Sequence, residues 1–387
     1  MFPSAERLAE INPFYVMNLL SRAEDLERQG KDIVHLEIGE PDFKSPPAVI
    51  EAGLRALRSG SVKYTPAAGL PALRHAISDY YQRRYQLNIS ADRVFVTPGA
   101  TGGLLLALGI LLNSGDQVLL ADPGYPCNRN LIRLFDAETK LIPVHPADNY
   151  QLSAESIRCH WGSNCRLALI ASPSNPTGTL IQNEQLRQIC NVVESYDGCI
   201  VSDEIYHGLE YESRATSALA FSDQVLVVNS FSKYFGMTGW RVGWLIVPDH
   251  LKGAADKLAQ NIFISAASHS QIAALASFEQ ENLNELENRR REFQRRRDYL
   301  YKQLTKLGFN IAVKPGGAFY IYANCSAFGM RSWDFAERLL ERSGVAITPG
   351  KDFGIAAPDE HLRFAYTNSR ERIEIAVERL ARFIEQI

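Results

Sequence analysis

The stretch from Ser230 to Trp244, SFSKYFGMTGWRVGW, holds the residues best suited to chemistry. Its one lysine, Lys233, has an amine that can form a Schiff base with an aldehyde or accept a proton. Arg241, eight residues later, offers a planar fork that suits a phosphate, and the hydroxyls of Ser230 and Ser232 can add to such a site. Taken alone this pattern is a weak signal, because most lysines are solvated surface charges.

A second candidate for phosphate binding is the turn Gly99-Ala100-Thr101, which follows the strand pattern VFVT and opens the helical run GGLLLALGILL. The free backbone N–H groups at the start of a helix bind anions, and the threonine hydroxyl can add a contact. The alternative is a strand-to-helix turn without a ligand. Two anion-binding turns in one chain favour a single phosphate group.

Asp203 ends another strand pattern, in CIVSDEIYHG. A carboxylate at the end of an interior strand is costly to desolvate unless a cation faces it. That cation is either a structural ion-pair partner or the protonated ring nitrogen of a cofactor, whose pKa a nearby carboxylate raises.

Three further side chains fit the same ring. Tyr206 and Asn175, the latter in SPSNPTG, can donate to a ring oxygen, and Tyr125, in DPGYP, can stack on the ring face. Each of them is also an ordinary turn or core residue. Together, a lysine for an aldehyde, a carboxylate for a ring nitrogen, donors for a ring oxygen and cations for a phosphate describe pyridoxal 5'-phosphate.

The elements that must position these residues alternate between strands and helices. The runs RVFVT, QVLLAD, RLALIAS, CIVSDE, QVLVVNS and RVGWLIV read as strands between helical patterns. This alternation predicts an α/β fold in which a large domain has a mostly parallel sheet flanked by helices. The turns should meet at the carboxyl ends of the strands, where ligands bind in such sheets.

The residue pattern changes from about Asn282, where a long helical pattern begins that carries six arginines between positions 289 and 297. Acidic residues interrupt them, so we expect a solvated linking helix and no nucleic-acid stripe. Beyond it, AFYIYA, GVAITPG and HLRFAYTN read as strands and two amphipathic helices follow, which predicts a smaller α+β domain. The expected division is an N-terminal arm with part of the small domain (1–45), a large cofactor-binding domain (46–283) and a C-terminal small domain (284–387).

The composition limits the binding partners, metal sites and cellular locations to be expected. The 387 residues include 41 Lys and Arg against 44 Asp and Glu, and this net charge of −3 gives no field to attract nucleic acid. The six cysteines form no CxxC pair, so we predict neither a zinc cluster nor a disulfide framework. The N-terminus lacks the pattern of a signal peptide, and no run of about 18 apolar residues occurs. We expect a soluble protein of the cytoplasm that does not bind membranes.

The chain resembles the class I/II aminotransferases of fold type I, and the resemblance runs nearly end to end. The motifs that carry it are HLEIGEPDF, KYTPAAGLPALR, VTPGAT, DPGYP, SPSNPTGT, SDEIY, SFSKYFGMTGWRVGW, GGAFY, ITPGKDFG and LRFAYTN. It implies ping-pong transfer of an α-amino group from an amino acid to a 2-oxo acid. It also implies pyridoxal 5'-phosphate as cofactor, and a homodimer with shared active sites.

The resemblance also implies a role for each matching residue. Lys233 would hold the cofactor and move the proton, Asp203 would pair with the pyridine nitrogen, and Asn175 and Tyr206 would hold the ring oxygen, with Tyr125 against the ring. The phosphate contacts would be Ala100, Thr101, Ser230, Ser232 and Arg241.

Three more residues complete the expected site. Tyr64, in KYTPAAG, would reach the phosphate of the neighbouring subunit; the alternative is a buried loop tyrosine. Arg363, in LRFAYTN, would clamp the substrate α-carboxylate, although an arginine on a strand is otherwise usually an ion-pair or edge residue. Gly39, in EIGEPDF, would approach the same carboxylate with its backbone, and Asn175 would contact the substrate as well.

Specificity is the least determined property. Some dicarboxylate-specific members of the family carry a lysine where Thr101 stands, and the segment from Ile11 to Val16, INPFYV, is mostly apolar and is expected to help shape the pocket. Both features favour neutral donors, such as alanine, branched or aromatic amino acids, with 2-oxoglutarate or pyruvate as acceptor. Two alternatives stay open: a carbon–sulfur β-lyase that uses the same cofactor, and a cofactor-sensing regulatory domain, which normally needs a DNA-binding module ahead of it.

Overall fold

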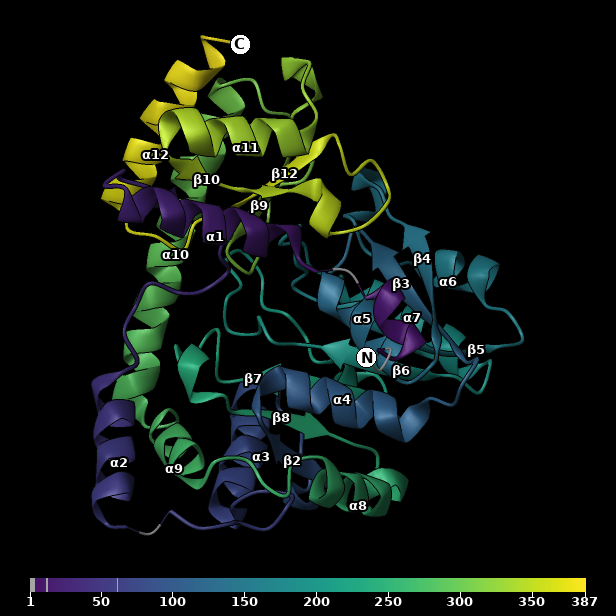
Figure 1. The fold of residues 1–387 in the computed structure, drawn as a ribbon. Helices are drawn as coiled ribbons and strands as arrows, with labels where there is room; N and C mark the ends of the chain where they lie inside the picture. Colours follow the sequence, from purple (N-terminus) through teal and green to yellow (C-terminus); the bar gives the residue numbers. More distant parts are fainter. Residues whose placement is uncertain (1–3, 12, 61) are drawn as a thin grey trace.

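The structure is a computed structural model that describes residues 4–11, 13–60 and 62–387 (Figure 1). Its largest sheet has seven strands in the order β2-β8-β7-β6-β5-β3-β4. These strands are β2 (Val94–Thr97), β3 (Gln117–Asp122), β4 (Glu138–Pro143), β5 (Cys165–Ala171), β6 (Cys199–Asp203), β7 (Leu226–Ser230) and β8 (Gly243–Ile246). Strands β3 to β7 pair in parallel, and β8 runs antiparallel to both of its neighbours, so the mostly parallel sheet is confirmed.

Register brings the carboxyl ends of the central strands together. Ala171 at the end of β5 pairs with Asp203 at the end of β6, and Asp203 pairs with Val228 of β7. The predicted strands are all present. The sequence reading missed β4, ETKLIP, an edge strand that carries charged residues and lacks the apolar run of an interior strand.

Helices cover both faces of this sheet. Successive strand residues alternate between two cores: Val228 packs in the core that includes Leu104 of α4, and Val227 packs in the core that includes Leu186 of α7. The helices are α1 (Tyr15–Arg28), α2 (Pro47–Arg58), α3 (Pro71–Tyr85), α4 (Gly99–Leu111), α5 (Pro126–Leu134), α6 (Ala154–His160), α7 (Asn183–Glu194), α8 (Lys252–Ile262), α9 (Ser268–Ala276), α10 (Gln280–Lys306), α11 (Ser332–Ser343) and α12 (Arg370–Ile384).

Two smaller sheets lie beside α1, α11 and α12 (Figure 1). One is antiparallel, in the order β11-β12-β9, and the other pairs β1 with β10 in parallel. Their strands are β1 (Val34–His35), β9 (Tyr320–Asn324), β10 (Val345–Ala346), β11 (Thr348–Pro349) and β12 (His361–Ala365). A segment near the start of the chain is thus held by one near its end. The predicted domain boundaries remain predictions, and the one at 284 falls inside the continuous helix α10.

Helix α10 is less solvated than its composition predicted. Arg296 and Arg297 are buried. Arg297 forms an ion pair with Glu212, and its Cζ lies 4.6 Å from the centre of the Tyr211 ring. Arg296 forms an ion pair with Asp42. The expectation of a solvated helix is wrong for these two arginines, because their partners come from segments far away in the sequence.

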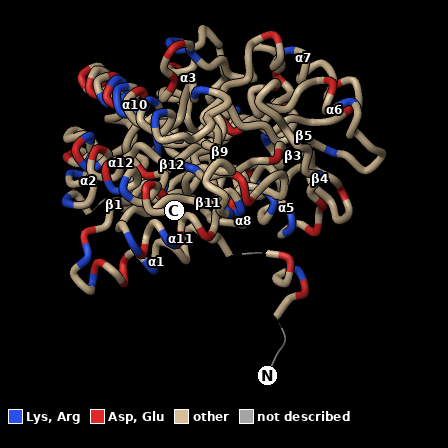
Figure 2. Tube along the Cα trace, turned by 90° about the horizontal axis from the view of Figure 1, so that it is seen from above, with Lys and Arg blue, Asp and Glu red and all other residues tan. Residues whose placement is uncertain are grey.

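Charges of both signs are mixed along the surface trace, most clearly on α10 (Figure 2). In the described part of the chain, no helix combines the length and the apolar character that crossing a membrane requires.

Candidate active site

A cavity of about 390 Å³ lies at the carboxyl ends of the central strands, between the large sheet and the smaller ones. It collects seven of the residues singled out from the sequence: Gly39, Tyr125, Asn175, Asp203, Tyr206, Lys233 and Arg363. They come from separate segments of the chain, so the fold makes this cluster.

Lys233 follows β7 and reaches into the cavity, where its Nζ donates to the carbonyl oxygen of Gly39 at 2.7 Å. Burial lowers the pKa of the Lys233 amine to about 8, and the nearby Arg363 and Arg241 guanidinium groups add to this shift. An amine with this pKa loses its proton close to neutral pH, as a nucleophile or a general base requires.

Asp203 is the last residue of β6 and is 5% exposed. Its Oδ1 accepts the Ile205 N–H at 3.2 Å, and no described side chain forms an ion pair with it. Burial raises the pKa of this carboxyl to about 7, while the Ile205 N–H and the charge of Lys233 oppose the rise. The structural ion pair that the sequence left open is therefore absent among the described residues, and the cavity side of Asp203 suits a cationic ligand.

Tyr206, Asn175 and Tyr125 all line the cavity as predicted, and each has a polar contact. The Tyr206 hydroxyl hydrogen-bonds the Tyr320 hydroxyl at 2.9 Å, and the Tyr125 hydroxyl accepts from the Cys127 thiol at 3.2 Å. Asn175 follows β5 and accepts from Arg363 Nη1 at 2.8 Å. One amide therefore touches both the arginine and the cavity.

Arg363 lies on β12 and is buried. Its Nη2 donates to the Glu37 carbonyl oxygen and to the Thr348 hydroxyl, and its Cζ stands 4.3 Å from the centre of the Tyr320 ring. Its Nε is buried without a hydrogen-bond partner in the described chain. A buried cation with an unused hydrogen-bond donor is suited to bind an anion.

Gly39 cannot carry a side chain here. A Cβ atom at this position would lie 1.8 Å from the Tyr320 hydroxyl oxygen. The glycine therefore lets its backbone approach the cavity between Tyr320 and Lys233.

Ala100, Thr101, Ser230, Ser232 and Arg241 form a second group, which we call the anion cradle. Gly99, before the cradle's two helix residues, has a φ of +70°, and a Cβ there would lie 2.6 Å from Arg241 Nη2. The Arg241 guanidinium thus covers the start of α4. Ser230 pairs with Gly243 in the sheet, and a Cβ atom added to Gly243 would lie 2.9 Å from the backbone nitrogen of Ala100. The Ser230 hydroxyl donates to the Ser232 hydroxyl at 2.9 Å.

The anion cradle lies beside the lining of the cavity, and Arg241 is close enough to Lys233 to influence its pKa. Helix-start N–H groups, hydroxyls and a guanidinium have gathered from three segments of the chain. This donor set suits a phosphate.

Tyr64 does not approach the cavity within one protomer. Its side chain is 81% exposed and lines a surface hollow with Lys63 and residues 265–269. The alternative of a buried loop tyrosine is therefore wrong.

The structure also places residues in the cavity that the sequence reading did not single out. They include Glu37, Tyr320, Thr348, Asp352, Phe353 and, from α1, Met17 and Leu20. Tyr320 belongs to the motif GGAFY, and Thr348, Asp352 and Phe353 belong to ITPGKDFG, but nothing in the local sequence marks these individual residues. Of the segment expected to shape the pocket, Phe14 and Val16 line the cavity, and Asn12 lies outside the described residues.

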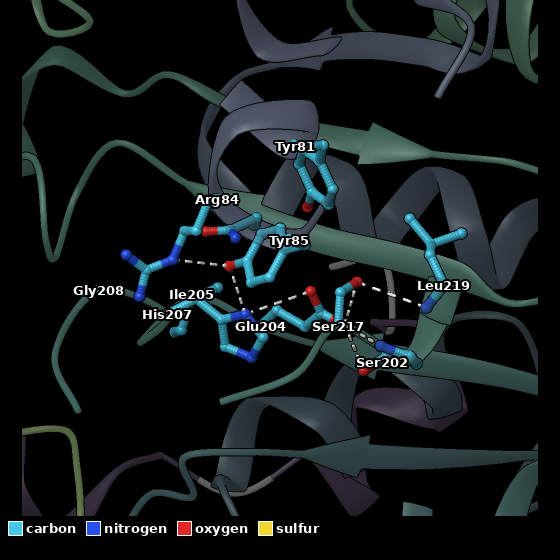
Figure 3. Close-up of polar contacts among 12 residues, drawn as sticks. Tyr81, Arg84, Tyr85, Ser202, Glu204, Ile205, His207, Gly208, Ser217 and Leu219 are labelled. Atoms are coloured by element: carbon cyan, nitrogen blue, oxygen red, sulfur yellow. Dashed lines mark hydrogen bonds and ion pairs between the residues drawn. The ribbon is translucent and has the colours of Figure 1, made fainter. Parts of the chain in front are cut away.

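A buried polar network backs the end of β6 (Figure 3). Glu204 Oε1 accepts from the hydroxyls of Ser202 at 3.2 Å and Ser217 at 3.0 Å, and from the Ala218 N–H at 2.8 Å. The Tyr85 hydroxyl lies 2.8 Å from His207 Nδ1, and burial lowers the pKa of this histidine to about 3, so the ring is neutral. These contacts fix the backbone on both sides of Asp203.

Known proteins match this chain over nearly its full length. The sequence model described as "Aminotransferase class I and II" matches residues 31–380. The chain belongs to the class I and II aminotransferase family. It is accordingly a transferase of the EC 2.6.1 type with the fold type I architecture.

Two curated aminotransferases illustrate the relationship. The chain is 38% identical over 378 residues to a valine–pyruvate aminotransferase of Mycobacterium tuberculosis, covering 97% of each chain. It is 37% identical over 385 residues to a (5-formylfuran-3-yl)methyl phosphate transaminase of Methanocaldococcus jannaschii, covering 99% of this chain and 100% of the relative. A solved aminotransferase structure from Mycobacterium tuberculosis superposes with a TM-score of 0.96 at 37% identity over the full length of both chains.

Proposed function

We propose that this aminotransferase moves the α-amino group of a neutral amino acid to a 2-oxo acid by a ping-pong reaction, with pyridoxal 5'-phosphate as its cofactor. The observation that carries this proposal is Asp203, a buried carboxylate without an ion-pair partner among the described residues, facing the same cavity as Lys233 and Arg363. A protonated pyridine nitrogen is the cation that this position lacks.

The residues of the chain divide the work. When bound, pyridoxal 5'-phosphate supplies an aldehyde that captures the amino group and a protonated ring that takes up electrons. Lys233 would hold the cofactor through its amine, and the same amine, when free, would move the Cα proton of the substrate. Asp203 would keep the ring nitrogen protonated, Asn175 and Tyr206 would hold the ring oxygen, and Tyr125 would pack against the ring.

The remaining assignments follow the donor sets. The anion cradle is proposed to hold the phosphate. Arg363 is proposed to bind the α-carboxylate of the substrate, together with Asn175 and the backbone at Gly39. We also propose a cytoplasmic homodimer, in which the exposed Tyr64 reaches the phosphate bound by a second copy of this chain.

The charges of the cavity favour a neutral donor. Among the described lining residues, Lys233 and Arg363 are the cationic side chains, and both are committed to the roles above. The lining also includes the acidic residues Glu37, Glu40 and Asp352, and apolar side chains from the start of α1. A distal carboxylate finds no cation there, so pyruvate is favoured over 2-oxoglutarate as acceptor. The similarity to a valine–pyruvate aminotransferase supports this choice.

The experiment that tests this function records the absorbance of the cofactor-loaded protein while single amino acids are added, with 2-oxo acid and ammonia assayed in parallel. Alanine, valine, leucine, phenylalanine, aspartate and cystathionine form the panel. Conversion to the pyridoxamine form with 2-oxo acid released and no ammonia supports the proposal. Accumulation of ammonia and pyruvate from a β-substituted substrate such as cystathionine indicates the β-lyase, and a preference for aspartate overturns the neutral donor.

Arg363→Ala is expected to raise KM at least about a hundredfold for every amino-acid donor, since charge-assisted hydrogen bonds to a carboxylate are among the strongest polar contacts. Steady-state kinetics over the same panel measures this. Arg372→Ala, which removes a half-buried arginine paired with Asp32 and absent from the cavity lining, is the matched control. A rise confined to one class of donor side chain would contradict an α-carboxylate clamp.

A further inference from the structure

Helix α1 begins at the wall of the cavity and needs help to begin there. The side chain of its N-cap residue, Phe14, cannot accept a hydrogen bond, so the helix receives no cap from its own N-cap residue. The first N–H groups of a helix have no partner within the helix, so a buried helix start needs acceptors from elsewhere.

Asp352 supplies them from a segment far away in the sequence. It ends the short 3-10 turn Gly350–Asp352 and is 2% exposed. Its Oδ1 accepts the Tyr15 N–H at 2.7 Å, and its Oδ2 accepts the Val16 N–H at 2.8 Å. Both carboxylate oxygens are thereby used, and a negative charge at a helix start also interacts favourably with the helix dipole.

This contact determines where one wall of the cavity stands. Phe14, Val16, Met17 and Leu20 of the α1 segment line the cavity, and so does Phe353, the neighbour of Asp352. The carboxylate of Asp352 therefore ties the apolar residues of α1 to the turn that carries Phe353. The Asp352 carbonyl is held separately, because it accepts from Arg129 Nη2 at 3.2 Å.

The other parts of the site are held mainly by other elements. Lys233 follows β7, Asp203 is the last residue of β6, and Arg363 on β12 contacts Asn175 and Thr348. The centre of the Phe353 ring also lies 4.9 Å from the Arg363 Cζ, but the hydrogen bonds of Arg363 do not involve Asp352. Loss of the helix cap therefore moves the wall without removing a group that holds the cofactor or the α-carboxylate.

We propose that Asp352 is a positioning residue that sets the preference for amino donors with long apolar side chains. The inference rests on the proposed function, and it assigns the α1 wall to the donor side chain. A methylene group that fits an apolar wall changes kcat/KM by about tenfold or more. The short side chain of alanine should therefore gain less from this wall than the longer side chains of leucine and phenylalanine.

The test uses the full-length holoenzyme and the variant Asp352→Asn, which keeps the size of the side chain but replaces one acceptor oxygen by an NH₂ group. We expect the ratio of kcat/KM for leucine to that for alanine to fall about tenfold. The absorbance of the bound cofactor and kcat/KM for alanine should stay within about threefold of wild type. Hydrogen exchange at the Tyr15 and Val16 amides should become faster.

Two further variants make the result decisive. Leu20→Ala removes part of the wall and should lower the same ratio while leaving the cap in place. Arg22→Ala breaks an ion pair with Glu341 elsewhere on α1 and should change nothing. An unchanged ratio in Asp352→Asn, or equal losses for alanine and leucine, overturns this inference while the proposed function stands. A wild-type protein that transaminates no amino acid overturns both.

Discussion

Replacing Lys233 with alanine is expected to reduce transamination by at least about a thousandfold, because in the proposed function one side chain both holds the cofactor and moves the Cα proton. The lowered pKa of about 8 and the position of Nζ inside the cavity make this lysine the group suited to both steps. Turnover with the best donor and the visible absorbance of the bound cofactor are the measurements. Cofactor should still bind without a covalent bond, because Asp203 and the anion cradle remain.

Lys252→Ala is the matched control, since this lysine pairs with Asp249 at the surface and does not line the cavity. Turnover of Lys233→Ala within about tenfold of wild type would remove Lys233 from general-base catalysis.

Asp203→Asn is expected to act in opposite directions on the two forms of the protein. In the holoenzyme, loss of the carboxylate that faces the ring nitrogen should lower kcat by about a hundredfold or more. In the cofactor-free protein, the neutral amide should be better tolerated than the buried carboxylate, so its Tm should be higher than that of wild type. The Ile205 N–H can still donate to the amide oxygen, which keeps the local geometry.

The pH dependence of this stability difference follows from the pKa shift. The carboxyl of Asp203 has a pKa of about 7 in the folded protein and about 4 when unfolded, so folding is opposed once the pH exceeds the unfolded value. The advantage of Asp203→Asn should be small near pH 4, grow as the pH rises to 7, and then level off at a value on the order of 4 kcal/mol.

Thermal unfolding of both cofactor-free proteins across this range measures the effect. Asp122→Asn is the control: Asp122 is a buried carboxylate at the end of the nearby strand β3, outside the cavity lining, and should not affect cofactor binding. A cofactor-free Asp203→Asn protein that is less stable than wild type at pH 8 would contradict this account.

The site residues that the sequence predicts are those that a short local motif identifies. Asp203 ends a recognisable strand, Lys233 and Asn175 follow two others, and parallel pairing places strand ends at one edge of a sheet. Their meeting in one cavity follows from strand order and register, so a correct reading of the strands was enough to group them.

The residues that the reading missed act through contacts between distant segments. Asp352 is marked by its bonds to the start of α1, and Tyr320 by its closeness to Gly39 and Tyr206. The burial of Arg296 has the same origin, because its partner Asp42 lies in another part of the chain. Periodicity and local motifs do not record such pairings, since they arise only when the chain has folded.

The pairing of β1 with β10 sets an order of assembly during synthesis. Translation proceeds from the N-terminus, so residues 34 and 35 leave the ribosome long before their partners at 345 and 346 exist. The anion cradle and Lys233 are complete once β8 has been made, whereas Arg363 and the Asp352 seat for α1 belong to the last part of the chain. On the roles proposed above, a nascent chain has Lys233 and the anion cradle for the cofactor before it has Arg363 for the substrate carboxylate. The seat that positions the α1 wall is also completed late.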